Sequence, residues 1–299
     1  MTRATRETVR ELLGLQAPST YRPVRVVRAA RPDLDGVRCE HVRLSTTDGD
    51  EIPCLLLTPR GPWRAAVVAL HQHGGEFELG KAEVVEAAGD PSLAYGRRLA
   101  DAGAAVLVPD LLGFEERQRD WSPNPQRSEQ LDALQRVAQG SSLQAKHTRD
   151  VAVATSWLHE QAGPSARLGV VGHSLGGQVA FFALAYDARL SAGVISCGVG
   201  TVASFVQERI EHNPAWFVPG LVRAGDTPAF AAAVRDQQVV VSAGTEDRLF
   251  PLAGVRDVVA ALPPDVSAIF FDGGHELTDD VMARARHVLL QDRPEPGAP

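Results

Sequence analysis

One short segment, Gly172-His-Ser-Leu-Gly176, has the residue types and spacing of a serine nucleophile held at a tight turn. The apolar run 168–171 before it predicts a buried strand, and the residues after it predict a helix. A chain that passes directly from strand to helix turns sharply, so its apex residue, Ser174, takes a strained backbone conformation and points above the sheet edge. Gly172 and Gly176 leave room for neighbouring backbone. The chemistry that this turn supports is nucleophilic attack on a carbonyl carbon.

A serine hydroxyl needs a base to remove its proton and a carboxylate to orient that base, and both follow downstream. Asp247 comes after the predicted strand 238–243, and His275 comes after the predicted strand 267–271. The carboxyl ends of parallel strands are where such sheets present reactive groups. The alternatives are that His275 caps the helix starting near Leu277, that Asp247 is a turn residue or helix cap, and that Glu246 is the acid.

The elements that must position these residues follow an alternating order of strands and helices. A short helix over 5–15 precedes a predicted antiparallel hairpin, 37–44 and 52–58, with its turn at Asp48-Gly49. From residue 65 onward, uniformly apolar strands alternate with helices, which indicates a parallel sheet covered on both faces. We expect a single domain over 1–299, lid-like excursions at about 111–147 and 198–236, and a disordered tail after about 291.

Composition excludes several classes of partner. The chain has 299 residues and a formal net charge of −7, whereas nucleic acid and anionic membranes are bound by basic faces. Acidic residues interrupt the arginines between Arg3 and Arg43, which predicts a solvated surface there. Neither a membrane span of about 20 apolar residues nor the apolar core of a signal peptide is found. Three scattered cysteines are too few for a disulfide framework or a zinc site, and a reducing cytoplasm fits best. Cys197 ends an apolar run and fits a small core residue. The oligomeric state is left open.

These motifs together resemble the α/β-hydrolase superfamily, and within it the dienelactone hydrolase and acetyl xylan esterase-like branch. The resemblance covers about residues 40–290. Beside the Ser174 turn, it rests on His71-Gln-His-Gly-Gly75, Pro109-Asp-Leu-Leu-Gly113, Trp216-Phe-Val-Pro-Gly220, Gly244-Thr-Glu-Asp247 and Gly273-Gly-His275. It implies an α/β class fold, with a mostly parallel twisted sheet, helices on both faces and lid insertions at the carboxyl ends of the strands.

The resemblance also implies an oxyanion hole made of two backbone N–H groups. One is that of Leu175, which follows the nucleophile, and the other belongs to the loop after His71. The family pattern assigns the second donor to His73, but Gln72 stands where glycine is usual, so either residue remains a candidate. His71 and His73 are also spaced as metal ligands on one strand face, although Gly74 and Gly75 favour close approach of backbone to substrate.

The expected activity is hydrolysis of a small-molecule carboxylic ester by Ser174, His275 and Asp247 through an acyl-enzyme, with no cofactor or metal. An ester is favoured over a peptide because an alcohol leaves with only modest protonation. The candidate lining of the substrate pocket is Gln72, Phe77, Phe114, Trp121, Trp216 and Phe217, with core packing as the alternative for each aromatic residue. The alternatives are a thioesterase or lactonase with the same catalytic residues, and a hydrolase-like binding protein or cyclase without acyl-enzyme chemistry.

Overall fold

A computed structural model describes residues 5–63, 65–86, 89–119, 122–163 and 165–290. Its centre is a nine-stranded sheet. The strands are β1 (Arg25–Ala30), β2 (Val37–Ser45), β3 (Glu51–Pro59), β4 (Ala65–Leu70), β5 (Ala105–Pro109), β6 (Arg167–His173), β7 (Ala192–Ser196), β8 (Gln238–Gly244) and β9 (Ser267–Phe271). The helices are α1 (Arg6–Leu13), α2 (Lys81–Glu86), α3 (Tyr95–Asp101), α4 (Pro125–Ala138), α5 (Leu143–Ala162), α6 (Leu175–Tyr186), α7 (Val202–Gln207), α8 (Asp226–Ala231), α9 (Leu252–Ala261) and α10 (Asp279–Leu290).

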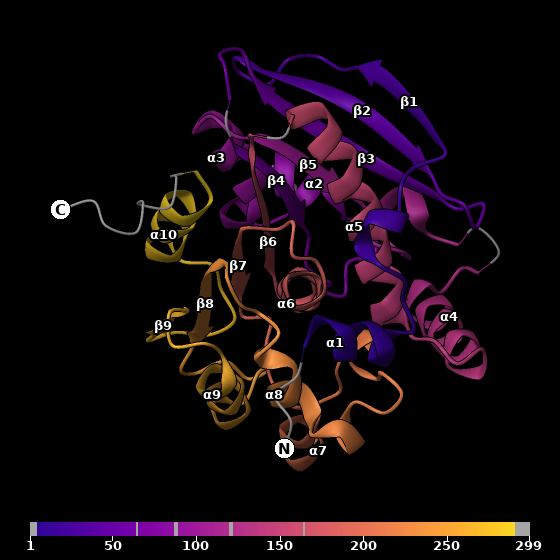
Figure 1. Ribbon diagram of the computed structural model, residues 1–299, viewed down its shortest axis with the longest axis vertical. Helices are drawn as coiled ribbons and strands as arrows, with labels where there is room; N and C mark the ends of the chain where they lie inside the picture. Colours follow the sequence, from indigo (N-terminus) through magenta and orange to yellow (C-terminus); the bar gives the residue numbers. More distant parts are fainter. Residues whose placement is uncertain (1–4, 64, 87–88, 120–121, 164, 291–299) are drawn as a thin grey trace.

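The strand order is β1-β2-β3-β5-β4-β6-β7-β8-β9, and it contains a reversal in the middle. The strands from β4 to β9 run parallel, whereas β1, β2 and β3 form an antiparallel edge (Figure 1). The chain passes from β4 to β5 on one side and then returns to place β6 on the other side of β4. Ligands of open α/β sheets bind at such a reversal, outside the carboxyl ends of the strands.

Helices cover both faces of the sheet and bury its apolar side chains in two clusters. Helices α1, α5, α6, α8 and α9 contribute to the first cluster, and α2, α3 and α10 contribute to the second (Figure 1). The side chains of β4 and β5 are buried on both faces, which explains their unbroken apolar sequence. The predicted fold class is therefore confirmed.

The antiparallel edge differs from expectation by one strand. The predicted hairpin is present as β2 and β3, with Val37 opposite Pro59 and Ser45 opposite Glu51. The arginine-rich segment also forms the strand β1, which pairs antiparallel with β2. All six residues of β1 are exposed, so neither face of the strand is selected to be apolar. Its sequence therefore lacks the alternation of apolar and polar residues by which a strand is recognised. Arg25 and Arg28 on this outer strand discourage pairing with another chain.

Further sequence predictions concern the chain ends and the membrane. The predicted first helix is α1, whose Thr5 side chain caps it by accepting from the Thr8 N–H. The predicted tail lies outside the described residues, and the single-domain assignment stays a prediction. Among the described helices, none has the length and apolar character needed to cross a membrane.

Candidate active site

Ser174 occupies a strained turn between β6 and α6, at the reversal of strand order. Its backbone angles are φ +54° and ψ −119°, which residues with a side chain rarely adopt. Two neighbouring glycines make this turn sterically feasible. A Cβ on Gly172 would lie 2.2 Å from the Gly176 carbonyl carbon, and a Cβ on Gly176 would lie 1.9 Å from the Leu70 carbonyl oxygen. The strand-to-helix turn therefore has the geometry expected from its sequence.

His275 and Asp247 meet at the carboxyl ends of β9 and β8. His275 Nδ1 lies 2.8 Å from Asp247 Oδ2, while Asp247 Oδ1 accepts from the N–H groups of Leu249 at 2.8 Å and Phe250 at 3.2 Å. Burial raises the pKa of Asp247, but the hydrogen bond from His275 and these N–H groups outweigh it and hold the pKa below its ordinary value. The carboxylate therefore remains ionised and fixes the proton of His275 on Nδ1.

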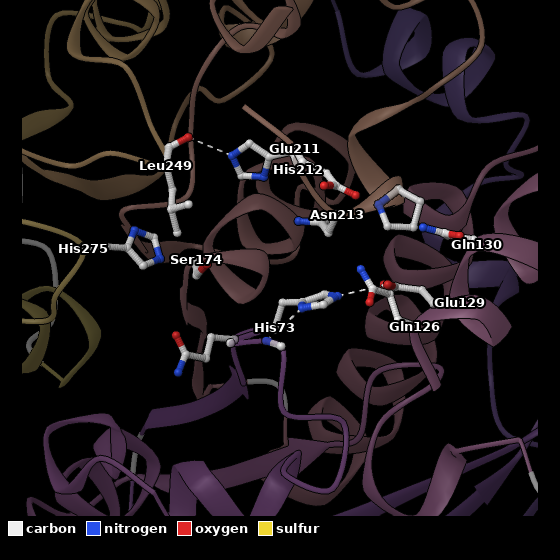
Figure 2. A pocket seen from close by; sticks show the side chains of 14 residues that line it. His73, Gln126, Glu129, Gln130, Ser174, Glu211, His212, Asn213, Leu249 and His275 are labelled. Atoms are coloured by element: carbon white, nitrogen blue, oxygen red, sulfur yellow. Dashed lines mark hydrogen bonds and ion pairs between the residues drawn. The ribbon is translucent and has the colours of Figure 1, made fainter. Parts of the chain in front are cut away.

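The other nitrogen of His275 is left available. Nε2 is buried and has no hydrogen-bond partner within the described residues. Figure 2 shows His275 beside Ser174, with a ring nitrogen turned toward the serine. Helix α10 begins at Asp279, and Thr278 caps it by accepting from the Val281 N–H, so His275 is not its cap. The Ser174 hydroxyl therefore lies beside His275 without a hydrogen bond between them, and Nε2 has no competing partner among the described residues.

Flanking side chains hold the imidazole of His275 in place. Phe250 stacks on it, with ring centroids 5.5 Å apart and an interplanar angle of 1°, and His173 lies on another side at 4.7 Å. Burial and the neighbouring His275 lower the pKa of His173 to about 3, so His173 is neutral. Cys197 lies close to Asp247 and His275, and burial raises the pKa of its thiol to about 12. The thiol therefore acts as a small core group, as its sequence context predicted.

The loop after β4 lies against the first turn of α6, where a second oxyanion donor is expected. The Leu70 and His71 carbonyls both approach Gly176. His71 is buried and ties this loop to the end of β5, because its Nε2 accepts from the Leu111 N–H at 2.9 Å and its Nδ1 donates to the Gln72 carbonyl at 2.7 Å. These bonds leave His71 without a lone pair for a metal ion.

A cavity of about 380 Å³ opens in front of Ser174. Figure 2 shows Ser174 and His275 on one side of the cavity and His73 in the middle. The α4 residues Gln126, Glu129 and Gln130 lie on the opposite side. Helix α4 belongs to the excursion 111–147, and a segment of the excursion 198–236 lines another wall. The lining residues are Gln72, His73, Gly74, Gly75, Gln126, Glu129, Gln130, Ser174, Glu211, His212, Asn213, Pro214, Leu249 and His275.

The predicted lining of this cavity is wrong for four of the five candidates that the structure describes. Among these five only Gln72 lines it; Phe77 and Phe114 stack on each other in the core, and Trp216 is buried there too. Phe217 lines a neighbouring apolar cavity of about 240 Å³. Trp121 lies outside the described residues. Large rings gain more from full burial than from lining a wet cavity, and the sequence near each ring did not distinguish the two locations.

Several polar lining residues were not foreseen from the sequence. Glu129 and the two glutamines beside it come from α4, and His212 and Asn213 precede the short 3₁₀ turn Pro214–Trp216. His212 hydrogen-bonds through Nε2 to the Leu249 carbonyl at 2.9 Å, and burial lowers its pKa to about 4. The signal that could have found them was the position of both excursions at the carboxyl ends of the strands.

Comparison with known proteins agrees with this architecture. Residues 88–237 match the family model of the alpha/beta hydrolase fold, so the chain belongs to the α/β-hydrolase fold family. It is 24% identical over 248 residues to YtaP of Bacillus subtilis (strain 168), a hydrolase by name, and the match covers 76% of this chain and 80% of YtaP.

Solved structures named for the predicted branch share the fold. Acetyl xylan esterase 1 of Thermoanaerobacterium sp. JW/SL YS485 superposes with a TM-score of 0.64 and 14% identity, over 97% of this chain and 95% of that one. The acetyl xylan esterase of Paenibacillus sp. R4 gives a TM-score of 0.67 and 16% identity, over 97% and 96%. The match to the family model confirms the predicted superfamily, and these structures share its fold.

Proposed function

We propose that the protein is a serine esterase that hydrolyses a carboxylic ester of a small molecule through an acyl-enzyme. The observation that carries the proposal is the 2.8 Å contact between His275 Nδ1 and Asp247 Oδ2, beside a serine at a strained turn. A carboxylate can only accept at this contact, so it favours the tautomer with the proton on Nδ1 and the lone pair on Nε2. An imidazole in this tautomer accepts the proton of a neighbouring hydroxyl, as the base of a serine hydrolase must.

In the proposed reaction, Ser174 Oγ attacks the ester carbonyl carbon while His275 Nε2 takes the hydroxyl proton. The tetrahedral intermediate collapses when His275 returns that proton to the departing alcohol, which leaves an acyl group on Ser174. A water molecule then attacks the acyl carbon with the same histidine as base, and the acid and free serine are released. Asp247 orients His275 and stabilises the imidazolium that forms in each half of the cycle.

The negative charge of each intermediate is assigned to a backbone oxyanion hole. The Leu175 N–H is in the first turn of α6, where helical N–H groups have no partner within the helix. The second donor is the N–H of His73, with Gln72 as the other candidate. Leu175 and His73 donate no backbone hydrogen bond to another described residue, so their N–H groups are free for a substrate oxygen. The Gln72 N–H instead donates to the Glu83 carboxylate, which favours His73 as the second donor. Losing one such donor costs roughly 3 to 4 kcal/mol in a serine hydrolase.

The test is the nucleophile itself. We expect Ser174→Ala to lower turnover of 4-nitrophenyl acetate by at least about 10⁴-fold and to abolish labelling by a fluorophosphonate. The matched control is Ser19→Ala, an exposed serine in the 3₁₀ turn Pro18–Thr20, which should keep both properties. If folded wild-type protein fails to label at Ser174, the proposal is overturned in favour of a hydrolase-like binding protein.

A further inference from the structure

Glu129 lines the cavity and has a buried carboxylate oxygen that the proposed reaction does not use. The residue lies on α4 and is only 4% exposed, yet it lines the cavity in front of Ser174. Its Oε2 lies 3.0 Å from His73 Nε2. Its Oε1 is buried and has no hydrogen-bond partner within the described residues. A carboxylate oxygen left without a donor in such a place is costly, so the site favours a ligand that supplies one.

The hydrogen bonds of His73 determine the charge of this pair. His73 Nδ1 accepts from the Gly75 N–H at 3.1 Å, so that nitrogen carries no proton. The proton is therefore on Nε2, which donates to Glu129. The imidazole is neutral in this tautomer, and the negative charge of the Glu129 carboxylate is not cancelled by its partner.

The rest of the cavity adds no compensating positive charge. Among the described lining residues there is neither lysine nor arginine, while Glu211 contributes a second carboxylate. Gln126, Gln130 and Asn213 add neutral amides. A substrate bearing a carboxylate would face two like charges here, and a substrate bearing an ammonium would face opposite charges in a partly desolvated site.

We propose that Glu129 is a specificity-determining residue, whose free Oε1 accepts a hydrogen bond from a protonated amine on the ester substrate. This inference rests on the proposed esterase function and names its substrate class, a cationic amino ester. Hydrogen bonds to charged groups favour a matched ligand by roughly 10- to 100-fold over one that lacks the donor.

The experiment compares two acetates of nearly equal shape, 2-(dimethylamino)ethyl acetate, which is protonated at neutral pH, and 3-methylbutyl acetate, which has carbon in place of the nitrogen. After spontaneous hydrolysis is subtracted, we expect wild-type kcat/KM to favour the amino ester by roughly 10- to 100-fold. Acetylcholine carries the charge without an N–H donor and should lie between the two. Equal values of kcat/KM for these three esters would overturn the proposal. A fourth ester, 3-hydroxybutyl acetate, has a neutral hydroxyl donor, and a higher kcat/KM for it than for the amino ester would also overturn the proposal.

The variant Glu129→Gln keeps an oxygen for His73 and can place an NH₂ group where Oε1 stood, so the preference for the amino ester should disappear. The control Glu160→Gln removes one charge near the far end of α5, on an exposed side chain paired with Arg22, and should keep the preference. If wild-type protein cleaves 4-nitrophenyl acetate but no alkyl acetate, competitive inhibition by 2-(dimethylamino)ethanol and 3-methylbutanol gives the same ratio. Absence of all esterase activity contradicts the proposed function itself, whereas activity without the ratio contradicts only the role of Glu129.

Discussion

At the scale of single residues, the proposed reaction depends on one charge that forms and one that compensates it. In that reaction His275 becomes positive when it accepts the serine proton, and two neighbouring imidazoles do not compete, because burial lowers the pKa of His173 to about 3 and that of His212 to about 4. Asp247 is the carboxylate in contact with the ring. Stabilisation of the imidazolium is therefore assigned to that carboxylate.

The change Asp247→Asn tests this assignment. An asparagine can donate an N–H toward His275 Nδ1 and so favour the tautomer with its proton on Nε2, which cannot serve as the base. We expect kcat for 4-nitrophenyl acetate to fall by about 10³- to 10⁴-fold. Glu246→Gln is the matched control, because Glu246 is exposed and was the alternative acid in the sequence. Equal losses in the two variants would contradict the assignment of Asp247.

At the scale of elements, the turn between β6 and α6 is limited by backbone crowding rather than by side-chain chemistry. A Cβ on Gly176 would lie 1.9 Å from the Leu70 oxygen, and this contact is with backbone, which cannot rotate away. Strand β4 and helix α6 would have to separate to relieve it, and the loop that carries the second oxyanion candidate would move with β4.

We therefore expect Gly176→Ala to lower the free energy of unfolding by at least about 2 kcal/mol, or to prevent folding altogether. Urea-induced unfolding followed by circular dichroism measures the loss. Gly61→Ala provides the control, because Gly61 is exposed and nothing lies within 4 Å of a Cβ built there. Its effect on the free energy of unfolding should stay within about 0.5 kcal/mol. A Gly176→Ala protein as stable as wild type would show that the turn tolerates a side chain.

The elements near the site were predictable because their signals are local. Strand β9 has the predicted bounds and β4 begins at the predicted residue 65, since uniform apolar runs ended by polar residues mark them. The Ser174 turn was predictable because its two glycines and its serine form a pattern within five consecutive residues. Strand β1 was not, because all its side chains are exposed and only its pairing with β2 defines it.

The cavity lining was not predictable in the same way. Which side chain of α4 faces Ser174 depends on how that helix packs against segments far away in the sequence, such as the turn Pro214–Trp216. Aromatic residues such as Phe114 were predicted to line the pocket because of their residue type, yet Phe114 packs in the core. Nothing in the sequence distinguishes Glu129 from the other charged residues of its helix, because only the fold determines its burial and its hydrogen bond with His73.

At the scale of the whole molecule, an ion-pair network joins the antiparallel edge to the helices beside the site. Asp50, at the end of the β2–β3 turn, pairs with Arg117 and with Lys146 Nζ at 2.7 Å. Asp150 of α5 completes the network, with Arg117 Nη1 at 2.9 Å and Lys146 Nζ at 2.8 Å. Arg117, Lys146 and Asp150 are almost fully buried. Removing one partner leaves buried charge uncompensated, which destabilises a fold more than the pair itself stabilises it.

The variant Asp50→Asn tests this network through its pH dependence. Burial raises the pKa of Asp50, but Arg117 and Lys146 outweigh it and lower the pKa from 3.8 to about 2. A lowered pKa contributes stability that is complete above the unfolded-state pKa near 3.8 and is lost as the pH falls toward 2. Because Asp50 is about one-third exposed, we expect a destabilisation of only about 1 to 3 kcal/mol at pH 7, with the difference from wild type shrinking below pH 4. Urea unfolding at pH 7, 5 and 3.5 measures this difference in the free energy of unfolding.

The control is Asp33→Asn, which breaks the exposed pair with Arg60 and should cost no more than about 0.5 kcal/mol at pH 7. An Asp50→Asn deficit that equals this control, or that grows as the pH falls, would mean that the network does not hold the antiparallel edge to α5.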